Sequence, residues 1–436
     1  MGGLLFGYDW VVIGGAKIFY EKFFGIASQP FLVGIATSIA LAGCMIGALT
    51  VGSLADRFGR KRLLSLAAFI FVISSIGTGA FNQFGLFLFA RFAGGIAIGM
   101  ASGLSPMYIA EVAPAPIRGK LVTMNQLTIV VGILAAQIVN WRIAGTHPEA
   151  WNAEMGWRWM FWVTAIPAFV FLVLSFFIPE SPRFQCMKSR IDDARKTLSR
   201  IGGPDYASEE IDAITAQTRE SGAAEGGLKT LFSKPFHKVL LLGIIVAFFQ
   251  QWSGTNIIFN YAQEIFQGAG YDVDSTFINI VITGVANLVF TFVAIFTVEK
   301  LGRRALMLMG AGSLAGIYLV LGACYFFNVS GVFMVILCVA AIACYAMTLG
   351  PITWVLIAEI FPNRVRAVAV AVSTLSLWVG SFTLTLSFPV LNSVLGTSGT
   401  FWIYSGICAA ALVYFIRNLP ETKGKSLEQL EKEMVR

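Results

Sequence analysis

Long apolar stretches alternate with short polar ones along almost the whole chain. A helix needs about 20 mainly apolar residues to cross the hydrocarbon core of a bilayer, and about twelve stretches of this length follow one another here. They are residues 1–19, 31–55, 63–81, 86–110, 120–141, 157–178, 238–263, 276–298, 305–327, 332–357, 366–390 and 399–418. The pattern predicts an all-α protein with twelve transmembrane helices.

The first stretch begins at Met1 with no basic residue before it, and Asp9 interrupts its apolar residues. A signal peptide has a basic segment followed by an uninterrupted apolar one, so this stretch is predicted to be a transmembrane helix instead. Either the helix begins at the terminus or the chain has lost a short cytoplasmic leader.

The composition supports a membrane protein. Of the 436 residues, 57% are hydrophobic and only 13% are charged, whereas soluble proteins carry about 25% charged residues. So few charges exclude a soluble enzyme, and the low polarity also excludes a disordered chain. The 44 glycines are typical of helices that pack closely in lipid.

The basic residues gather in one set of loops. They follow the second, fourth, sixth, eighth and tenth stretches, whereas the opposite loops hold few. Because cytoplasmic loops of membrane proteins are rich in Lys and Arg, we expect a multi-pass cell (inner) membrane protein with both termini in the cytoplasm. The basic cytoplasmic loops account for the net charge of +7, so we expect no nucleic-acid partner.

A polar segment divides the chain. Residues 183–235 carry charged stretches that are broken by glycine and proline, which indicates a cytoplasmic linker with short helices. We expect one six-helix bundle over residues 1–182, a second over residues 236–421, and a cytoplasmic tail over residues 422–436. The protein is expected to be monomeric in the bilayer.

The two bundles repeat three motifs at equivalent helix ends. The pairs are residues 56–61 (DRFGRK) and 299–304 (EKLGRR), residues 110–118 (AEVAPAPIR) and 358–366 (AEIFPNRVR), and residues 179–181 (PES) and 420–422 (PET). A duplicated helical unit is an architecture of secondary transporters, which place their substrate site between the repeats.

These motifs resemble those of the sugar porters of the major facilitator superfamily. The matching strings are residues 52–62 (GSLADRFGRKR), 179–183 (PESPR), 250–256 (QQWSGTN), 350–354 (GPITW) and 420–424 (PETKG), in order over almost the whole chain. The resemblance implies the major facilitator fold, with two pseudo-symmetric six-helix bundles that rock around one sugar site in alternating access.

Charged residues at the helix ends are candidates for a cytoplasmic gate. If the helices bundle, the first-half set lies close together and the second-half set repeats it, so ion-pair networks could form while this side is closed. The sets are Asp56, Arg57, Arg60, Glu111 and Arg118 in the first half, and Glu299, Arg303, Glu359 and Arg366 in the second. The alternative is that they are only topological anchors and helix caps.

Asp9 and Arg91 are the charged residues predicted to lie far from a helix end. An ionisable side chain at such depth usually serves function. With Arg91 near, the Asp9 carboxylate keeps its charge. With Arg91 withdrawn, the carboxylate is left in apolar surroundings that favour its protonated form, so the pair can act as a proton switch. The resemblance agrees, because proton-coupled sugar porters tend to have Asp here. A static structural ion pair is the alternative.

Amides within the apolar stretches are candidates for sugar binding, because an amide both donates and accepts hydrogen bonds and aromatic rings stack on sugars. By resemblance, sugar-contacting positions are Gln126, Gln250, Gln251, Asn256, Asn287, Trp354 and Trp378, and outer-gate positions are Asn260 and Tyr261. Trp354 follows Gly350-Pro351, where a broken helix would leave its ring exposed. The alternative is that the amides only join helices.

Three positions depart from the family pattern. Leu377 and Ser381 stand where several members have amides, and Ile133 stands where the bacterial xylose symporter has glutamine. The second-half wall of the pocket is therefore expected to be less polar than usual, which favours a pentose or a sugar that lacks one hydroxyl.

The sequence thus predicts a proton-coupled monosaccharide symporter, with a facilitative sugar uniporter as the alternative. His147 and His237 fall in loops, and the six cysteines show no paired spacing. We therefore expect no catalytic residues, no metal site and no cofactor, with the proton gradient as the energy source.

Overall fold

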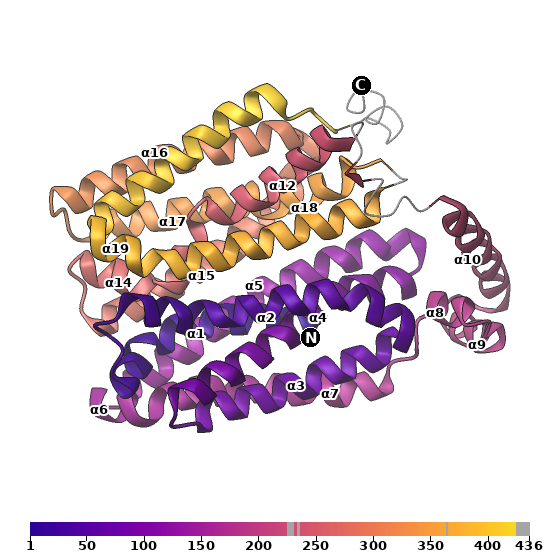
Figure 1. The fold of residues 1–436 in the computed structure, drawn as a ribbon, viewed down its shortest axis with the longest axis horizontal. Helices are drawn as coiled ribbons and strands as arrows, with labels where there is room; N and C mark the ends of the chain where they lie inside the picture. Colours follow the sequence, from indigo (N-terminus) through magenta and orange to yellow (C-terminus); the bar gives the residue numbers. More distant parts are fainter. Residues whose placement is uncertain (225–230, 233–235, 363–364, 424–436) are drawn as a thin grey trace.

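The computed structural model describes residues 1–224, 231–232, 236–362 and 365–423, and these form helices joined by short loops (Figure 1). The first six long helices correspond to the first six apolar stretches. They are α1 (Gly2–Phe24), α2 (Pro30–Phe58), α3 (Arg60–Ala80), α4 (Phe84–Val112), α5 (Ala115–Thr146) and α7 (Trp157–Phe177). The short α6 (Glu149–Trp151) and the π-helical turn η1 (Asn152–Gly156) lead into α7. We call α1–α7 the first half.

The remaining apolar stretches form the second half. Its helices are α12 (His237–Trp252), α13 (Thr255–Asn260), α14 (Ala262–Gly268), α15 (Val273–Leu301), α16 (Arg303–Phe326), α17 (Val332–Met347), α18 (Leu349–Glu359) and α19 (Arg366–Asn418). The long α19 contains the last two predicted stretches, which meet where Gly396 takes a φ of 68°.

Three short helices lie between the halves in the chain and occupy the polar segment. They are α8 (Pro182–Met187), α9 (Ile191–Gly202) and α10 (Pro204–Ala224), and they project from one end of the bundle (Figure 1). We call this end, where residues 56–62 and 302–304 also lie, the basic end. The other end, where α6 and α14 lie, is the opposite end.

Two of the predicted helices are broken rather than continuous. The stretch 238–263 is interrupted before α13 at Gly254, whose φ is 85°. The stretch 332–357 is interrupted at Thr348, and Gly350-Pro351 lie in the first turn of the helix that follows. The second break confirms the expected interruption beside Trp354, and that side chain is 41% exposed.

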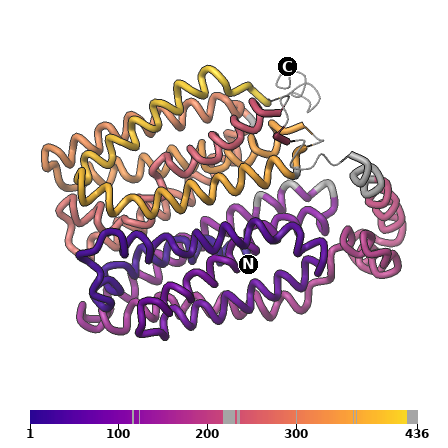
Figure 2. Tube along the Cα trace, in the orientation of Figure 1, coloured from indigo at the N-terminus to yellow at the C-terminus, as the bar shows by residue number. Residues whose placement is uncertain are grey.

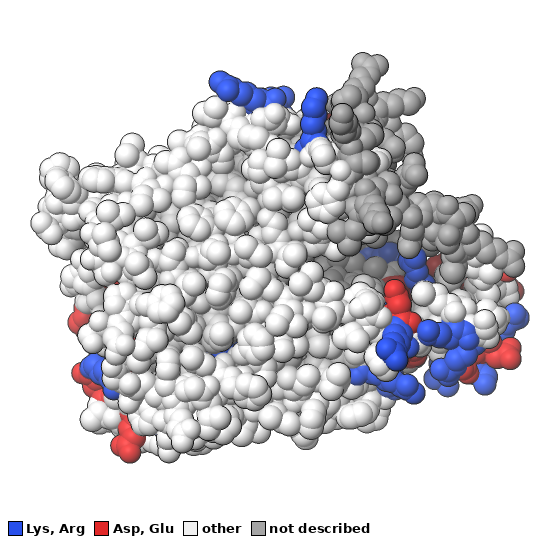
Figure 3. Space-filling view, in the orientation of Figure 1, with Lys and Arg blue, Asp and Glu red and all other residues white. Residues whose placement is uncertain are grey.

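Within the described residues, ten stretches are long and apolar enough to cross a membrane, one of which spans Val368–Asn418. Helix α1 is not among them, because Asp9, Lys17, Glu21 and Lys22 interrupt its apolar residues. In the view of Figure 3 most charged side chains lie toward the two ends of the molecule, and the surface between them carries few charges. Many large hydrophobic side chains of the long helices are exposed, among them Phe69, Phe169 and Phe296. This is the surface of an integral membrane protein.

The two halves pack in the same way. In the first half α2 contacts α4, α1 contacts α5 and α3 contacts α7, and in the second half α15 contacts α17, α12 contacts α19 and α16 contacts α19. The halves meet chiefly along two helix pairs, α2 with α19 and α5 with α15, and α1 also contacts α13 and α14. Figure 2 shows them as two groups of nearly parallel helices, one above the other.

Glycines allow the closest helix contacts. A Cβ atom built on Gly95 would lie 1.9 Å from the backbone oxygen of Ala40, and one built on Gly99 would lie 2.3 Å from that of Cys44. Any side chain at these two positions would therefore push α4 away from α2, and the position of Arg91 on α4 depends on this contact.

Candidate functional site

Asp9 and Arg91 meet inside the first half. The Arg91 Nη1 atom donates a hydrogen bond to Asp9 Oδ1 at 2.7 Å, and both side chains are buried. The guanidinium also lies 5.2 Å from the centre of the Phe161 ring. The sequence therefore identified two charged residues, far apart in the chain, that the fold brings together.

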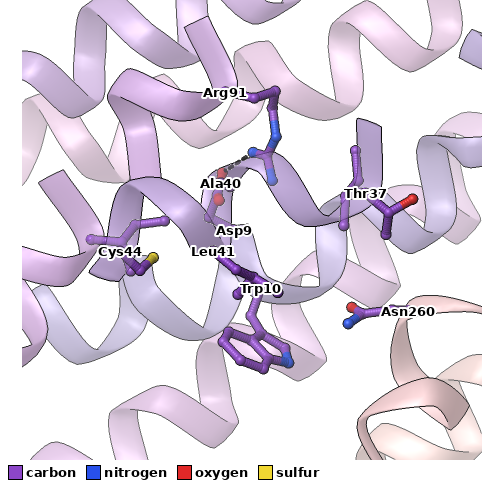
Figure 4. A pocket seen from close by; sticks show the side chains of 10 residues that line it. Asp9, Trp10, Thr37, Ala40, Leu41, Cys44, Arg91 and Asn260 are labelled. Atoms are coloured by element: carbon purple, nitrogen blue, oxygen red, sulfur yellow. Dashed lines mark hydrogen bonds and ion pairs between the residues drawn. The ribbon is translucent and has the colours of Figure 1, made fainter. Parts of the chain in front are cut away.

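A small cavity opens beside this pair (Figure 4). Its wall includes Asp9, Arg91, Thr37 and Trp10 from the first half and Asn260 from the second, and it has room for about one water molecule. The Asn260 Oδ1 atom is buried without a hydrogen-bond partner.

Trp10 connects this cavity to the second half. The Trp10 indole packs against the Trp378 ring of α19, with centroids 6.0 Å apart, and the Phe6 ring lies 5.9 Å from the Trp378 ring. Trp378 is buried, and its Nε1 atom has no hydrogen-bond partner. Trp10 was not predicted as a site residue, although its place next to Asp9 was an available signal.

The amides of α12 and α13 form a hydrogen-bonded chain. Gln250 donates to the Tyr345 hydroxyl at 2.6 Å, Gln251 donates to Gln250 Oε1 at 2.6 Å, and Asn256 donates to Gln251 Oε1. All three amides are buried. Tyr345 was missed by the sequence reasoning, because a single tyrosine in an apolar helix carries no signal of its own.

The other candidate sugar residues lie on different helices. Gln126 of α5 is half-buried, and Asn287 of α15 is buried. Trp354 of α18 presents an exposed ring on the basic-end side of the helix break. The candidates therefore come from both halves, as a site between two moving bundles requires.

The predicted outer-gate residues lie where the two halves meet at the opposite end. Tyr261 is fully buried, donates from its hydroxyl to the backbone oxygen of Thr385 at 2.7 Å and packs on Phe388 with ring centres 4.4 Å apart. Asn260 is buried beside it and lines the cavity described above.

Lys17 is a buried charge that the sequence reasoning missed. The expectation that only Asp9 and Arg91 lie deep was wrong, because α1 continues to Phe24 and the Lys17 side chain is 3% exposed. Its ammonium is paired with Glu21 one turn further on and with Glu264 of the second half. The four-residue spacing of Lys17 and Glu21 on one helix was the available signal.

At the basic end, charged groups of the first half bond to one another. Arg60 Nη2 lies 2.9 Å from Glu111 Oε1 and 3.1 Å from Asp56 Oδ1. Glu180 Oε1 accepts hydrogen bonds from the backbone N–H groups of Arg60 and Lys61 at 2.9 and 3.1 Å. Glu180 thus caps the start of α3.

The second half repeats this arrangement. Arg303 Nη2 lies 3.2 Å from Glu359 Oε1, and Glu421 accepts from the backbone N–H groups of Arg303 and Arg304 at 2.9 and 3.1 Å. Thr422 donates to Glu359 at 2.6 Å. The paired motifs of the sequence are therefore one structural unit that occurs in each half.

The remaining candidate gate residues lie around these units. Arg57 is exposed, with its guanidinium 5.2 Å from the Phe58 ring, and Arg118 Nη2 lies 3.6 Å from Glu210 Oε1 of α10. Arg366 donates to the backbone oxygen of Phe361. The Glu299 side chain lies outside the described part of the structure.

Comparisons with known proteins agree on one family. A family model described as "Sugar (and other) transporter" matches residues 1–434. The arabinose-proton symporter of Bacillus subtilis (strain 168) is 36% identical over 433 residues, which are 99% of this chain and 92% of that protein. The D-xylose-proton symporter of Escherichia coli (strain K12) is also 36% identical, over 99% of this chain and 93% of that protein.

Solved structures agree in fold and distinguish conformations. The inward-open form of the xylose transporter XylE from E. coli superposes with a TM-score of 0.88 at 34% identity, over 99% of this chain and 97% of that one. XylE bound to 6-bromo-6-deoxy-D-glucose covers the same shares, also at 34% identity, with a TM-score of 0.82. Of these two forms, the structure described here is more similar to the inward-open one.

Proposed function

The chain belongs to the sugar (and other) transporter family and has the major facilitator fold, and from this we propose that it is a proton-coupled monosaccharide symporter. As a member of this family it is a transporter and not an enzyme. The observation that carries the proposal is the buried pair of Asp9 and Arg91, 2.7 Å apart, beside a cavity that both halves line.

The Asp9 carboxylate is the proposed proton carrier. In this structure Arg91 donates a hydrogen bond to the carboxylate, and in the proposed cycle the carboxylate takes up a proton when the two side chains separate. A change in the charge of Asp9 therefore changes the preferred position of α1, which is how a proton gradient could drive alternating access. No bound cofactor enters this scheme.

The proposed sugar site lies between the halves. Gln126 of the first half and Gln250, Gln251, Asn256 and Asn287 of the second supply amide groups to the hydroxyls. Trp354 and Trp378 supply aromatic faces for stacking. Relatives are named for arabinose, xylose and glucose, so the proposed substrate is a pentose or hexose. The apolar Ile133 and Leu377 favour one that lacks a hydroxyl group.

The distribution of charge sets the proposed orientation. Lys and Arg concentrate at the basic end, so we place this end and both termini in the cytoplasm of a bacterial inner membrane, with the monomer as the working unit. The basic end is then the cytoplasmic end, and the opposite end is the outer end, where Asn260 and Tyr261 form the outer gate.

The units at the cytoplasmic end are the proposed inner gate. Each ion pair of Arg60 with Glu111, or of Arg303 with Glu359, joins residues of one half. These pairs hold helix ends in each half as a rigid unit, and closure of the gate brings the two units together. Asp56, Arg57, Arg118 and Arg366 flank these pairs and complete the charged surfaces that meet, and Glu299 stays a candidate from the sequence repeat alone.

A facilitative uniporter shares every feature except proton coupling, and a vesicle assay separates the two. The purified protein is reconstituted in proteoliposomes, and uptake of labelled xylose, arabinose and glucose is measured with and without an imposed inward proton gradient. Symport predicts accumulation above the external concentration that a protonophore abolishes. If each transported sugar only equilibrates across the membrane under the gradient, the result would favour the uniporter.

A further inference from the structure

The two halves touch directly at the outer end, across residues 14–18 of α1 and residues 259–264 of α13 and α14. A Cβ atom built on Gly14 would lie 2.7 Å from the backbone oxygen of Phe259, so the two backbones are in contact. Gln263 donates from Nε2 to the backbone oxygen of Gly15 at 3.0 Å. The outer end is closed by these contacts.

Lys17 places a positive charge inside this contact. Its side chain is 3% exposed, and its ammonium is bonded to the Glu264 carboxylate of the second half and lies 3.3 Å from Glu21 Oε1. The ammonium also lies 4.4 Å from the centre of the Tyr261 ring. A buried ammonium costs several kcal/mol unless such partners surround it, so these contacts depend on one another.

We propose that Lys17 and Glu264 form a charged latch that holds the outer end closed and separates each time the carrier opens outward. The latch rests on the alternating access proposed above, and it adds a residue pair that sets the balance between its two states. The pair has this effect because its members lie on different halves, whereas Lys22 and Glu149, paired at the same end, both lie on the first half.

The local geometry makes the latch reversible. When the halves separate, Lys17 retains Glu21, which lies one turn away on the same helix. Glu264 is already 31% exposed, so it becomes hydrated as α14 moves away. Opening therefore leaves no buried charge without a partner, and both states remain accessible to the protein.

The test is a distance measurement between the halves at the outer end. Gln29 and Ser330 are exposed in loops of the first and second halves, and each is replaced by cysteine and spin-labelled after removal of the native cysteines. In liposomes without sugar, Lys17→Met and Glu264→Gln should each raise the ratio of outer-open to outer-closed molecules by about tenfold or more. Glu264→Gln supplies the result if Lys17→Met fails to fold.

Two further variants make the result specific. Lys22→Met removes the exposed pair with Glu149 and should leave the ratio unchanged. The exchange Lys17→Glu with Glu264→Lys again joins the halves by a lysine–carboxylate pair. Opening would leave two adjacent carboxylates on α1, so the exchange should return the ratio to the original value or below it. The latch is wrong if the single variants leave the distances unchanged, or if the exchange behaves like the single variants.

This measurement is independent of the transport assay. The distances report the position of the outer end whether or not sugar moves together with protons. A failure of proton-driven uptake would therefore remove the symport proposal and leave the latch in place, and a failure of the latch would leave symport in place.

Discussion

Trp10 of α1 packs against Trp378 of α19, with ring centroids 6.0 Å apart and 56° between the ring planes. Trp10 follows Asp9 directly, and Trp378 is a candidate sugar-binding residue. In the proposed mechanism, a movement of α1 that accompanies protonation of Asp9 reaches the candidate sugar site through the contacts of Trp10 and Phe6 with Trp378.

This contact predicts that Trp10→Ala loosens the coupling between proton and sugar. An aromatic pair contributes about 0.5–1.5 kcal/mol, so the steady-state accumulation ratio should fall about 2- to 10-fold, while exchange of sugar across the membrane continues. Accumulation and counterflow are measured in the same proteoliposomes. Trp159→Ala, at an exposed position of α7, is the matched control, and an equal loss in both variants would contradict the prediction.

The Asp9–Arg91 pair predicts that removal of one partner costs more stability than removal of both. Arg91→Gln leaves a buried carboxylate without its cation and should lower the free energy of unfolding by about 3–5 kcal/mol. The double variant Asp9→Asn/Arg91→Gln should recover most of this loss. Thermal unfolding in detergent measures both, and a double variant less stable than Arg91→Gln would show that the pair is not coupled.

The amide chain predicts that Gln251 contributes to sugar affinity. Gln251→Ala should raise the KM for the transported sugar about tenfold. It also leaves the buried Gln250 and Asn256 amides without their partner, so some loss of stability, about 1–3 kcal/mol, accompanies the change in KM. Asn140 is the matched control, because this buried amide donates to the backbone oxygen of Val12 and so joins α5 to α1. Asn140→Ala should lower stability and leave the KM unchanged.

If both variants change stability and neither changes the KM, the buried amides serve only to join helices. That outcome would support the alternative left open by the sequence, in which polar groups within the apolar stretches stabilise helix packing and make no contact with sugar.

The backbone hydrogen bonds to Glu421 predict that its carboxylate stabilises the basic end of the protein in a pH-dependent way. Burial raises the pKa of its carboxyl group, but hydrogen bonds from the backbone N–H groups of Lys423, Arg303, Arg304 and Thr422 together lower the pKa below its ordinary value of 4.5. Because the pKa is lower in the folded protein, the stabilisation is present above pH 4.5 and is lost as the pH falls through the folded-state pKa.

Glu421→Gln should therefore lower the melting temperature at pH 7, by at most about 2 °C because solvent screens the charge of this partly exposed carboxylate. The difference from the original protein should shrink as the pH is lowered below 4.5. A difference that stays constant between pH 7 and pH 4 would show that the charge of Glu421 is not what stabilises the start of α16.

The helices were predictable because each apolar stretch is long enough to cross a bilayer and is bounded by charge, glycine or proline. The repeated motifs also indicated that Arg60 belongs with Glu111 and Arg303 with Glu359. The roles of Glu180 and Glu421 were not foreseen, although both lie in the repeated motifs. Asp9 and Arg91 stood out because charges are rare in such helices.

Other features depend on three-dimensional contacts that no local pattern records. Tyr345 and Trp10 are ordinary aromatic residues in apolar helices, and only the fold places them against Gln250 and Trp378. Lys17 was overlooked because its position near the end of an apolar stretch suggests exposure. Its burial results from the contact of α1 with α13 and α14, which belong to the other half.

The central claim, that Asp9 carries the proton which moves with the sugar, is tested most directly by sugar-induced proton movement. Proteoliposomes containing a pH-sensitive dye are mixed with the transported sugar in the absence of an imposed gradient. The original protein should acidify the interior as sugar and proton enter together, and Asp9→Asn should exchange sugar without any proton movement. Sugar entry without acidification in the original protein, or undiminished acidification in Asp9→Asn, would contradict the account.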